Sequence, residues 1–539
     1  MAKAKSDLSK LQNGSDIRGI ALTGIEGELP NLCADEAIKI ARGYLVWLCK
    51  KTGKRPDELK IAIGRDPRMS GQSLFHSLNT GMGPYGVQVL DCSIASTPAM
   101  FMSTLFPDFE CDGAIMITAS HLPFNRNGFK FFDKTGGLNR EDISEIIETA
   151  KGGKKKLEPL GPAVFEDNFF MDLGKKTYPS QPADLMKEYC HHLRKIIIDR
   201  VGEGPEPLKG LKIVVDAGNG SGGFYANYVL KPLGADTTGS IFLEPDGTFP
   251  NHAPNPEDRD AMAAISMAVL TTGSDLGLIF DTDVDRSSAV DGRGREISRN
   301  RIVALAAAIV AEEHPGTTVV TDSITSTQLT EFLERDLGLS HFRFKRGYKN
   351  VINKAIQLNK EGRDAQLAIE TSGHAALKEN YFLDDGAYLA TLIVVKAAKL
   401  AKEGKTTDSL IENMKDPEEA REIRMNISRE DFGPYGDTVL DDLKKWISVG
   451  LTDACATSVH SKEASPAPVG MSPEEPNYEG VRINFDKDNG DGWCLLRKSL
   501  HDPLMAMNME SNTKGGCKII SGKMRSFLKN YPDLDISKL

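Results

Sequence analysis

The sequence predicts a multidomain α/β protein with largely parallel sheets, and three observations support this. The chain has 539 residues, which is too long for one hydrophobic core and predicts three to five domains. Apolar runs of strand length alternate with stretches of helical periodicity, and polar clusters follow several of the apolar runs. The expected strands cover residues 59–63, 87–90, 114–118, 211–215, 276–280, 318–321 and 366–369, and the expected helices cover 34–51, 183–199, 301–312 and 386–402.

Changes in composition divide the chain into predicted domains. A segment rich in Gly, Lys and Pro at 151–182 is typical of a linker, and further breaks fall near Ser298 and Pro417. In the last region, residues 461–477 are loop-like and short strands are expected at 481–485 and 493–496. We therefore predict three related α/β domains with mixed sheets, followed by an α+β domain, with boundaries at 1–160, 181–297, 298–417 and 418–539.

Composition excludes several classes of protein. With 40% hydrophobic and 26% charged residues, the chain is an ordinary globular protein. Its formal net charge of −10 argues against a general binder of nucleic acids or anionic membranes. An anionic substrate would need a site that gathers basic residues locally.

The cysteines and the N-terminal segment bear on the compartment. The eight cysteines are scattered without a Cys-x-x-Cys pair, so neither a zinc site nor a disulfide framework is indicated. We find no run long enough to span a bilayer and no signal-peptide hydrophobic region at the start. We expect a reducing, cytoplasmic location, or the plastid stroma if a transit peptide is missing from this chain.

Three polar clusters lie directly after expected strands, at residues 118–123, 281–286 and 370–374. In open α/β sheets, ligands bind at the carboxyl ends of the strands. Loops from three domains are therefore predicted to meet over one cleft.

The first cluster contains Ser120, followed by His121. Pro123 and the turn-forming Asn-Gly pair at 127–128 favour a constrained loop. His121 is a candidate for proton transfer or phosphate binding, and Lys130 is a candidate cation or base. The alternative is a βα turn that carries an incidental serine.

The second cluster, Asp281-Thr282-Asp283-Val284-Asp285, is followed by Arg286. Alternate residues of an extended loop face the same way, so the three carboxylates can converge on one hard cation. A calcium EF-hand is excluded, because its sixth and twelfth positions need Gly and Glu and a helix should precede it. A solvated acidic turn is the remaining alternative to a magnesium site with room for a phosphate oxygen.

Three further clusters carry weaker signals. Residues 370–374 (Glu-Thr-Ser-Gly-His) offer donors and acceptors suited to sugar hydroxyls, although ordinary loop chemistry is the alternative. Arg497, near the end of an expected strand, is suited to bidentate phosphate binding, with a solvated hairpin end as the alternative. The glycine-rich stretch 216–222 lacks a Gly-Lys-Ser/Thr and is interpreted as a tight βα turn.

Taken together, these motifs resemble those of the α-D-phosphohexomutase superfamily, which includes phosphoglucomutases and phosphomannomutases. Ser120 matches the phosphorylated serine of its Thr-Ala-Ser-His-Asn-Pro loop, and the Asn-Gly-x-Lys continuation ends at Lys130. The other matches, in the same order as in the family, are Asp281, Asp283, Asp285 and Arg286 in the metal loop, Glu370, Ser372, Gly373 and His374 in the sugar loop, and shorter echoes at 16–19 (with Arg18), 64–68, 97–98, 216–220 and 252–256.

The resemblance implies four domains around one cleft and a phosphoserine mechanism. A phosphoryl group would pass from Ser120 to a hexose monophosphate, giving a 1,6-bisphosphate that reorients and returns its other phosphate. Magnesium would be held by Asp281, Asp283, Asp285 and a phosphoserine oxygen of Ser120. The remaining implied roles are catalysis by His121, Lys130, Arg286 and Arg18, and substrate binding by Glu370, Ser372, His374, Arg497, Ser499 and His501.

Departures from the family pattern leave the exact activity open. Leu122, Thr282 and Ile369 replace an Asn and two Gly residues of the motifs. In the last loop, Leu500-His501 stands where the family has Gly-Thr, although His501 is a candidate donor in place of the threonine.

We therefore expect a mutase acting on glucose or mannose phosphates, with Mg²⁺ and a hexose 1,6-bisphosphate as cofactors. The alternatives are a hexose 1,6-bisphosphate synthase and a non-catalytic hexose-phosphate sensor. We expect no nucleic-acid or membrane partner, and a monomer or weak homodimer.

Overall fold

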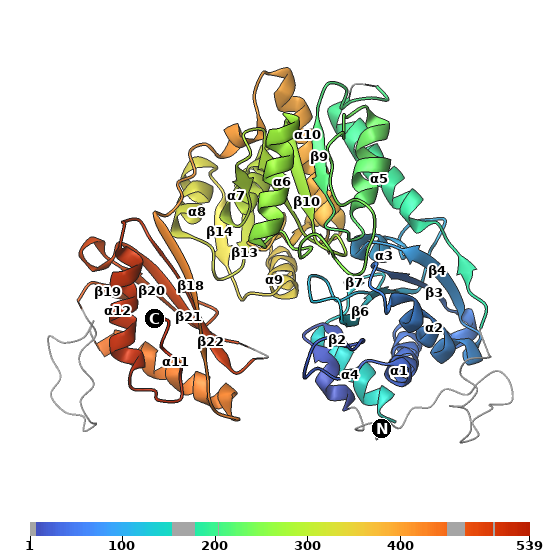
Figure 1. Cartoon of the computed structure of the whole chain (residues 1–539), viewed down its shortest axis with the longest axis horizontal. Coiled ribbons are helices and arrows are strands. Elements are labelled where there is room, and N and C mark those ends of the chain that lie inside the picture. The colour runs from blue at the N-terminus through green and yellow to red at the C-terminus, as the bar shows by residue number, and fades with distance from the viewer. Residues whose placement is uncertain (1–6, 153–177, 203, 450–468, 500–501) are drawn as a thin grey trace. The chain divides into compact units, whose positions relative to one another are not determined.

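The computed structural model describes residues 7–152, 178–202, 204–449, 469–499 and 502–539 (Figure 1). The chain folds into two compact units. Unit 1 contains residues 1–310 and 366–411, and unit 2 contains residues 311–365 and 412–539.

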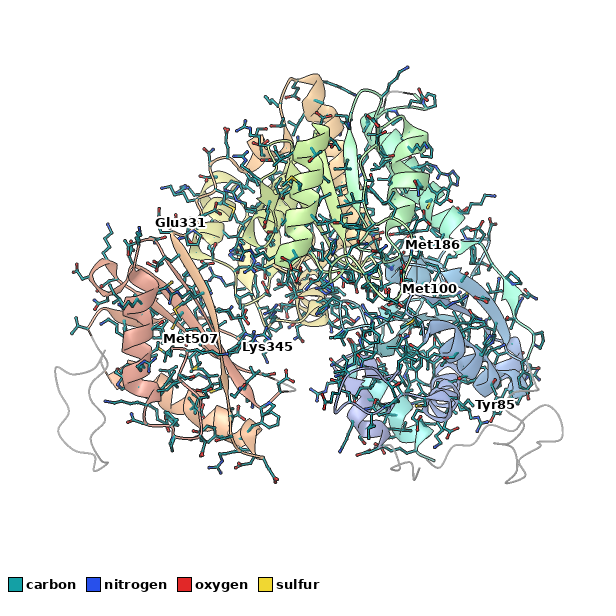
Figure 2. The ribbon with its side chains drawn as sticks, in the orientation of Figure 1. Tyr85, Met100, Met186, Glu331, Lys345 and Met507 are labelled. Carbon is teal, nitrogen blue, oxygen red and sulfur yellow. The ribbon has the colours of Figure 1, made fainter. Side chains whose placement is uncertain are left out.

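Unit 1 begins with an eight-stranded mixed sheet. Its helices α1 (Ala34–Thr52), α2 (Gly71–Met82) and α4 (Arg140–Ala150) contribute to one hydrophobic core with the sheet, and α3 (Thr97–Met102) contacts β5. Tyr85, labelled in Figure 2, belongs to this core. The strand order is β1 (Gln12–Asn13), β2 (Asp16–Ile20), β6 (Arg126–Asp133), β5 (Gly113–Ile117), β3 (Lys60–Arg65), β4 (Gln88–Ile94) and β8 (Gln181–Pro182), with β7 (Gly136–Gly137) paired to β6.

A second, four-stranded sheet in unit 1 has the order β12 (Glu296–Ile297), β11 (Ser287–Asp291), β10 (Leu276–Phe280) and β9 (Ile213–Asp216). Helices α6 (Arg259–Thr272) and α10 (Gly386–Lys402) contact it, and α5 (Leu185–Val201) packs against α10. Strands β15 (Leu367–Ile369), β16 (Ala375–Leu377) and β17 (Leu383–Asp384) pair antiparallel. Helix α7 (Asn300–Glu313) follows the second sheet.

Unit 2 contains a parallel pair, β13 (Thr318–Thr321) and β14 (Ser340–Arg343), with helices α8 (Thr327–Glu331) and α9 (Tyr348–Lys360). Its C-terminal part is a five-stranded antiparallel sheet that shares a core with α11 (Phe432–Val449) and α12 (Gly516–Leu528). Met507, labelled in Figure 2, is buried in that core. The strand order is β18 (Glu419–Asn426), β22 (Leu504–Ser511), β21 (Gly492–Lys498), β20 (Val481–Phe485) and β19 (Met471–Pro473).

The predicted mixed-sheet α/β domains are confirmed, although the sheets are less parallel than the alternation of strands and helices alone indicated. In the first sheet β3 pairs in parallel with β4 and β5, whereas β6 is antiparallel to β5. In the second, β9 and β10 are parallel and β11 is antiparallel to β10. The reason is that each predicted site loop is the turn of an antiparallel hairpin (β5–β6, β10–β11 or β15–β16) rather than a connection to a helix.

All seven strands expected in the α/β region and all four expected helices are present, with bounds that differ by a few residues. Two expectations of loop structure were wrong in part. Strand β8 lies at the end of the predicted linker, whose residues 153–177 are outside the described part, and pairs with β4. Strand β19 lies within the segment expected to be a loop and pairs with β20. The four domain boundaries stay predictions. Among the described residues, no helix is both long and apolar enough to cross a membrane.

Candidate functional site

Ser120 lies just beyond β5, and the loop around it presents its hydroxyl to two charged groups. Its backbone is in the left-handed region, with φ of +50°, a conformation that costs a non-glycine residue about 1 kcal/mol or more. The hydroxyl donates to Asp281 Oδ2 over 3.0 Å, and Arg286 Nη2 donates to the hydroxyl oxygen over 3.1 Å. The side chain is buried, so these two contacts fix its direction.

The strained conformation of Ser120 is stabilised by Arg68. The Arg68 side chain is fully buried and pairs with Asp66 over 3.1 Å. Its guanidinium also donates, over 2.5 to 3.1 Å, to four backbone carbonyl oxygens of the serine loop, those of Ser120, Leu122, Pro123 and Arg126. Since the planar guanidinium has its donors in a fixed geometry, Arg68 sets the course of the whole loop.

His121 contacts the same arginine as Ser120 does. Arg286 Nη2 lies 2.6 Å from His121 Nδ1, and because arginine can only donate, this nitrogen must be an acceptor. Burial lowers the pKa of His121 to about 2, and the charges of Arg286 and His374 contribute to this shift. His121 is therefore neutral in this arrangement and is suited to orient Arg286.

The three aspartates of the second loop, Asp281, Asp283 and Asp285, are buried, and each offers one carboxylate oxygen within 4.8 Å of the others. Asp283 Oδ1 and Asp285 Oδ1 have no hydrogen-bond partner among the described residues. Buried carboxylate oxygens without partners are costly, and oxygen is the ligand that hard cations prefer. The donor set therefore fits a divalent cation.

The charges around this loop affect its carboxyls differently. Burial raises the pKa of Asp281 well above its usual range, and the charge of Asp285 adds to the rise. Burial acts on Asp285 in the same direction, but Lys130, His374 and Arg286 outweigh it and hold the pKa of Asp285 below its usual range. Lys130 Nζ makes a short ion pair with Asp285 and lies 3.4 Å from Asp283 Oδ2.

The shape of the aspartate loop depends on contacts from elsewhere in unit 1. Thr97, the first residue of α3, donates to Asp283 twice, from its backbone nitrogen to the carbonyl oxygen over 2.8 Å and from its hydroxyl to Oδ2 over 2.5 Å. Val284 has φ of +66°, which is rare for a β-branched residue. Its carbonyl accepts from Gly386 N over 3.1 Å.

Arg286 joins the serine and aspartate loops and is 2% exposed. In addition to Ser120 and His121, it donates from Nε to Asp281 Oδ2 over 3.1 Å and from Nη1 to Asn255 Oδ1 over 3.3 Å. Burial acts to lower its pKa, but the surrounding carboxylates, Asp281 foremost, raise it. Arg286 thus stays charged next to the Ser120 oxygen.

The third loop, residues 370–374, joins the aspartate loop through backbone contacts. Arg286 and His374 form an isolated antiparallel bridge, and Gly373 has φ of +92° with no room for a side chain against the Ser287 carbonyl. Glu370 and Ser372 are both buried here. The structure therefore brings this predicted sugar loop into the same site.

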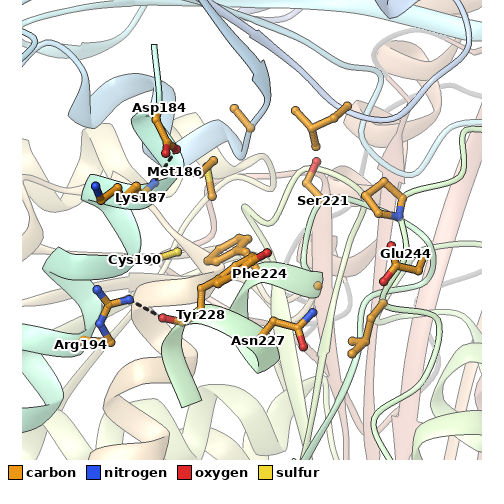
Figure 3. A pocket seen from close by; sticks show the side chains of 15 residues that line it. Asp184, Met186, Lys187, Cys190, Arg194, Ser221, Phe224, Asn227, Tyr228 and Glu244 are labelled. Atoms are coloured by element: carbon orange, nitrogen blue, oxygen red, sulfur yellow. Dashed lines mark hydrogen bonds between the residues drawn. The ribbon is translucent and has the colours of Figure 1, made fainter. Parts of the chain in front are cut away.

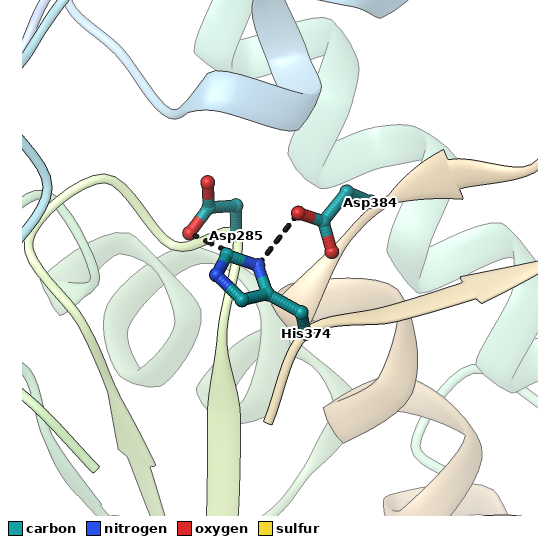
Figure 4. Close-up of side chains that lie close together, drawn as sticks. All are labelled: Asp285, His374 and Asp384. Carbon is teal, nitrogen blue, oxygen red and sulfur yellow. Dashed lines mark hydrogen bonds and ion pairs between the residues drawn. The ribbon is translucent and has the colours of Figure 1, made fainter. Parts of the chain in front are cut away.

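His374 lies between two carboxylates (Figure 4). Its Nδ1 is 2.6 Å from Asp384 Oδ2 and 3.8 Å from Asp285 Oδ1. Burial acts to lower the pKa of His374, but Asp384 and Asp285 outweigh it and raise the pKa to about 9. His374 therefore adds a positive charge beside the aspartate loop.

The other predicted site residues lie at the edge of this network or in the other unit. Arg18 on β2 pairs with Asp16 over 2.8 Å and donates to the Thr118 carbonyl, next to the serine loop. Arg497, in β21, and Ser499, just after it, belong to unit 2. Leu500 and His501 lie outside the described residues.

Sequence reasoning assigned no role to several residues that shape the site. Arg68, Thr97 and Asn255 lie within the shorter echoes of family motifs, which by themselves indicate no role. The signal that could have indicated Arg68 is its spacing from Asp66, because an aspartate two residues before an arginine after a buried strand is suited to a local ion pair.

The fold and the site together define a protein of α/β domains with a buried serine beside three carboxylates that could hold a metal ion. Three sequence families described as phosphoglucomutase/phosphomannomutase, alpha/beta/alpha domains I, II and III, match residues 9–157, 187–294 and 298–416. The chain therefore belongs to the phosphoglucomutase/phosphomannomutase family of the α-D-phosphohexomutase superfamily. A further β-rich domain follows these three.

Relatives of similar length support the family assignment. A phosphomannomutase/phosphoglucomutase of Pseudomonas syringae pv. tomato is 28% identical over 91% of this chain and 92% of its own. A phosphoglucomutase of Neisseria meningitidis serogroup A is 28% identical over 99% of both chains. A family protein of Burkholderia thailandensis has the same fold, with a TM-score of 0.70, 24% identity and 97% of both chains covered.

Proposed function

We propose that this protein is a mutase that interconverts hexose 1-phosphate and hexose 6-phosphate, with glucose or mannose as the sugar. The observation that carries the proposal is the position of the buried Ser120 hydroxyl between Arg286 and Asp281. The names of the relatives, phosphoglucomutase and phosphomannomutase, support the same activity.

In this proposal Ser120 carries the phosphoryl group and passes it to a sugar hydroxyl, so that a 1,6-bisphosphate is the intermediate. Arg286 is placed to stabilise negative charge on the Ser120 oxygen. Neutral His121 accepts a hydrogen bond from Arg286 and so orients its guanidinium. Lys130 is proposed to supply a positive charge beside the aspartate loop. Glu370, Ser372 and His374 are proposed to bind the sugar, while Arg497, Ser499 and His501 bind its phosphate. Arg18 is proposed to support the serine loop.

Magnesium binding is typical of the family, and Asp281, Asp283 and Asp285 would hold the ion together with a phosphoserine oxygen. When bound, the ion supplies charge neutralisation for the group in transfer. The unpartnered oxygens Asp283 Oδ1 and Asp285 Oδ1 support this assignment.

Intact-mass spectrometry after incubation with glucose 1,6-bisphosphate tests the proposal. We expect the wild-type protein to gain one phosphoryl group and Ser120→Ala to gain none and to lose mutase activity. Ser93→Ala is the matched control, because Ser93 is an exposed serine with a similar φ of +55°. A Ser120→Ala variant that kept full activity would disprove the mechanism.

A bisphosphate synthase is the second candidate, and the Leu500-His501 sequence in the last loop is the observation that favours it. Net accumulation of glucose 1,6-bisphosphate from glucose 1-phosphate and a bisphosphate donor would support the synthase. Turnover that requires only catalytic bisphosphate would support the mutase. If neither reaction nor phosphorylation occurs while hexose phosphate binds, the protein is a sensor.

Three further predictions accompany the proposal. We expect a monomer or weak homodimer, which sedimentation velocity can test. We expect no binding of nucleic acid or membranes. The cytoplasm is the expected compartment, with the plastid stroma as the alternative.

A further inference from the structure

A cavity of about 690 Å³ lies in unit 1, apart from the serine and aspartate side chains described above (Figure 3). Residues of helix α5 line one side of it, and Ser221, Phe224 and Leu243 are also among the lining residues. Its volume is within the range of small-molecule sites in proteins. Nothing in the proposed mutase reaction uses it.

The cavity combines an apolar interior with two cations. Met186, Cys190, Phe224 and Leu243 provide apolar surface, and burial raises the pKa of Cys190 to about 12, so its thiol stays neutral. Lys187 and two turns later Arg194 project from α5 at the cavity (Figure 3). Arg194 Nη1 donates to the Tyr228 carbonyl, which holds the guanidinium at the cavity wall.

Two acidic residues, Asp184 and Glu244, also line the cavity, and only Asp184 lies on the α5 side. The carboxylate of Asp184 caps α5 and accepts from Lys187 N over 3.2 Å. Glu244 lies across the cavity from α5 (Figure 3). Of the charged lining residues on the α5 side, Lys187 and Arg194 are cationic and only Asp184 is anionic, so the net charge there is positive and favours an anionic group.

Ser221 adds a hydrogen-bonding group on the other side. It is 6% exposed, and its hydroxyl has no hydrogen-bond partner among the described residues. A buried hydroxyl without a partner is unfavourable.

Two segments that line the cavity connect directly to the aspartate loop. Ser221 N donates to the Thr282 carbonyl over 2.8 Å, and Thr282 lies between two of the site aspartates. Ala95, which also lines the cavity, is two residues before Thr97, which donates twice to Asp283. A ligand in the cavity would thus contact segments that hold the loop from two directions.

We propose that this cavity binds a small aromatic anion and that its occupancy changes the affinity of the aspartate loop for a divalent cation. The aromatic body lies against Phe224 and Met186, and the anionic group lies between Lys187 and Arg194. The binding part of this proposal is independent of the mutase activity.

Fluorescence titration of the full-length protein with anilinonaphthalene sulfonate, an aromatic anion, tests the binding. We expect one saturable site, and weaker binding of the uncharged analogue phenylnaphthylamine. The double variant Lys187→Gln/Arg194→Gln should raise the Kd about tenfold or more, because two charge-assisted contacts are lost. Met186 is a half-buried lining residue, so Met186→Trp should fill part of the cavity and abolish the saturable signal.

The matched control is Lys195→Gln/Lys209→Gln, which removes two positive charges from exposed positions that do not line the cavity. It should bind the dye like the wild type. Non-saturable binding, or equal binding by all the variants, would overturn the proposal, since the dye would then lie elsewhere.

The connection to the aspartate loop is tested by the same titration with saturating Mg²⁺. Linkage requires that dye and cation change each other's affinity by the same factor, and we expect a change of about fivefold or more, as is common for coupled sites. Isothermal calorimetry of Mg²⁺ with and without dye should give the reciprocal change. Equal affinities in both measurements would refute the connection.

Discussion

Arg286, in the serine–aspartate site of unit 1, and Arg497, in the β21–β22 hairpin of unit 2, have opposite surroundings. Arg286 is almost completely buried, and its donors are directed to Ser120, His121, Asp281 and Asn255. Arg497 is partly exposed, and its buried Nε has no hydrogen-bond partner among the described residues. Burial lowers the pKa of Arg497, and the like charge of Arg346 adds to this shift.

The difference suits the two arginines to different tasks: Arg286 is preorganised at the proposed reacting group, whereas Arg497 can still bind an anion. The donors of Arg286 at the proposed reacting end are already directed to acceptors, so this arginine needs little rearrangement when charge develops. Arg497 has a donor, Nε, without an acceptor in the described part of the chain and a like-charged neighbour, both of which favour a bound anion. We therefore expect substitutions in unit 1 to affect kcat and stability, and substitutions near Arg497 to affect KM.

The largest effect is expected at the aspartate loop. Asp283→Asn should lower kcat/KM by about two to three orders of magnitude, because a metal ligand contributes several kcal/mol of charge stabilisation. The Mg²⁺ concentration for half-maximal activity should rise as well, and steady-state kinetics at varied Mg²⁺ measures both. The exposed Asp246→Asn is the control. Unchanged Mg²⁺ dependence would remove Asp283 from the metal site.

Next in size is the effect of the arginine that supports the serine loop. Arg68→Lys should lower the free energy of unfolding by about 3 kcal/mol, since it disrupts a buried ion pair and its carbonyl contacts, and kcat should fall. Arg65→Lys, three residues earlier, is the matched control because Arg65 pairs with the partly exposed Asp91 and lies over the Phe75 ring, and neither contact is with the serine loop. Chemical denaturation and kinetics compare them. Equal losses in both variants would show that Arg68 has no special role.

On the other side of the comparison, Arg497→Gln should raise KM about tenfold, which corresponds to roughly 1.4 kcal/mol for a lost charge-assisted contact. We expect kcat to change much less. Lys498→Gln is the adjacent control, because Lys498 pairs with Asp437 over 2.6 Å. A fall in kcat at constant KM would contradict the proposed division between the two regions.

The smallest expected effects concern two histidines, one in each unit. His252 lies between Asp216 Oδ2 and the Ala253 carbonyl, each 2.9 Å away. Burial acts to lower its pKa, but Asp216 outweighs this and raises it. In unit 2, burial lowers the pKa of His341 well below its usual range, and both its nitrogens contact threonine hydroxyls.

The two histidines should therefore give opposite pH dependences of stability, each of at most about 1.4 kcal/mol per pH unit. Because the pKa of His252 is higher in the folded than in the unfolded protein, its stabilising contribution is complete below the unfolded pKa of about 6.5. This contribution is lost as the pH rises through the folded pKa. His341, whose folded pKa is lowered, contributes its full stability above the unfolded pKa. This contribution is lost as the pH falls below the unfolded pKa. Denaturation of His252→Asn and His341→Asn between pH 5 and 9, each compared with wild type, measures both slopes. Slopes of the same sign would contradict the assignment.

Much of the site could be predicted from the sequence because its signals are local. Runs of apolar residues located β5, β10 and β15, and the polar residues after each strand gave Ser120, the aspartates and Glu370. Since strand ends place their loops at a sheet edge, the order of these motifs was enough to predict one shared site. The local pattern alone did not indicate which strands are antiparallel, because a polar turn after a strand looks the same whether a helix or an antiparallel strand follows.

What the sequence by itself determined is therefore the α/β class, the family resemblance and the identity of the three loops that unit 1 brings together. Only the tertiary structure decided how their side chains are used. Arg286 reaches Ser120 across 166 positions of the chain, Lys130 reaches Asp285 across 155, and Thr97 reaches Asp283 across 186. Such contacts leave no periodic signal, because their geometry depends on how separate sheets pack together, and the packing also creates the cavity beside α5.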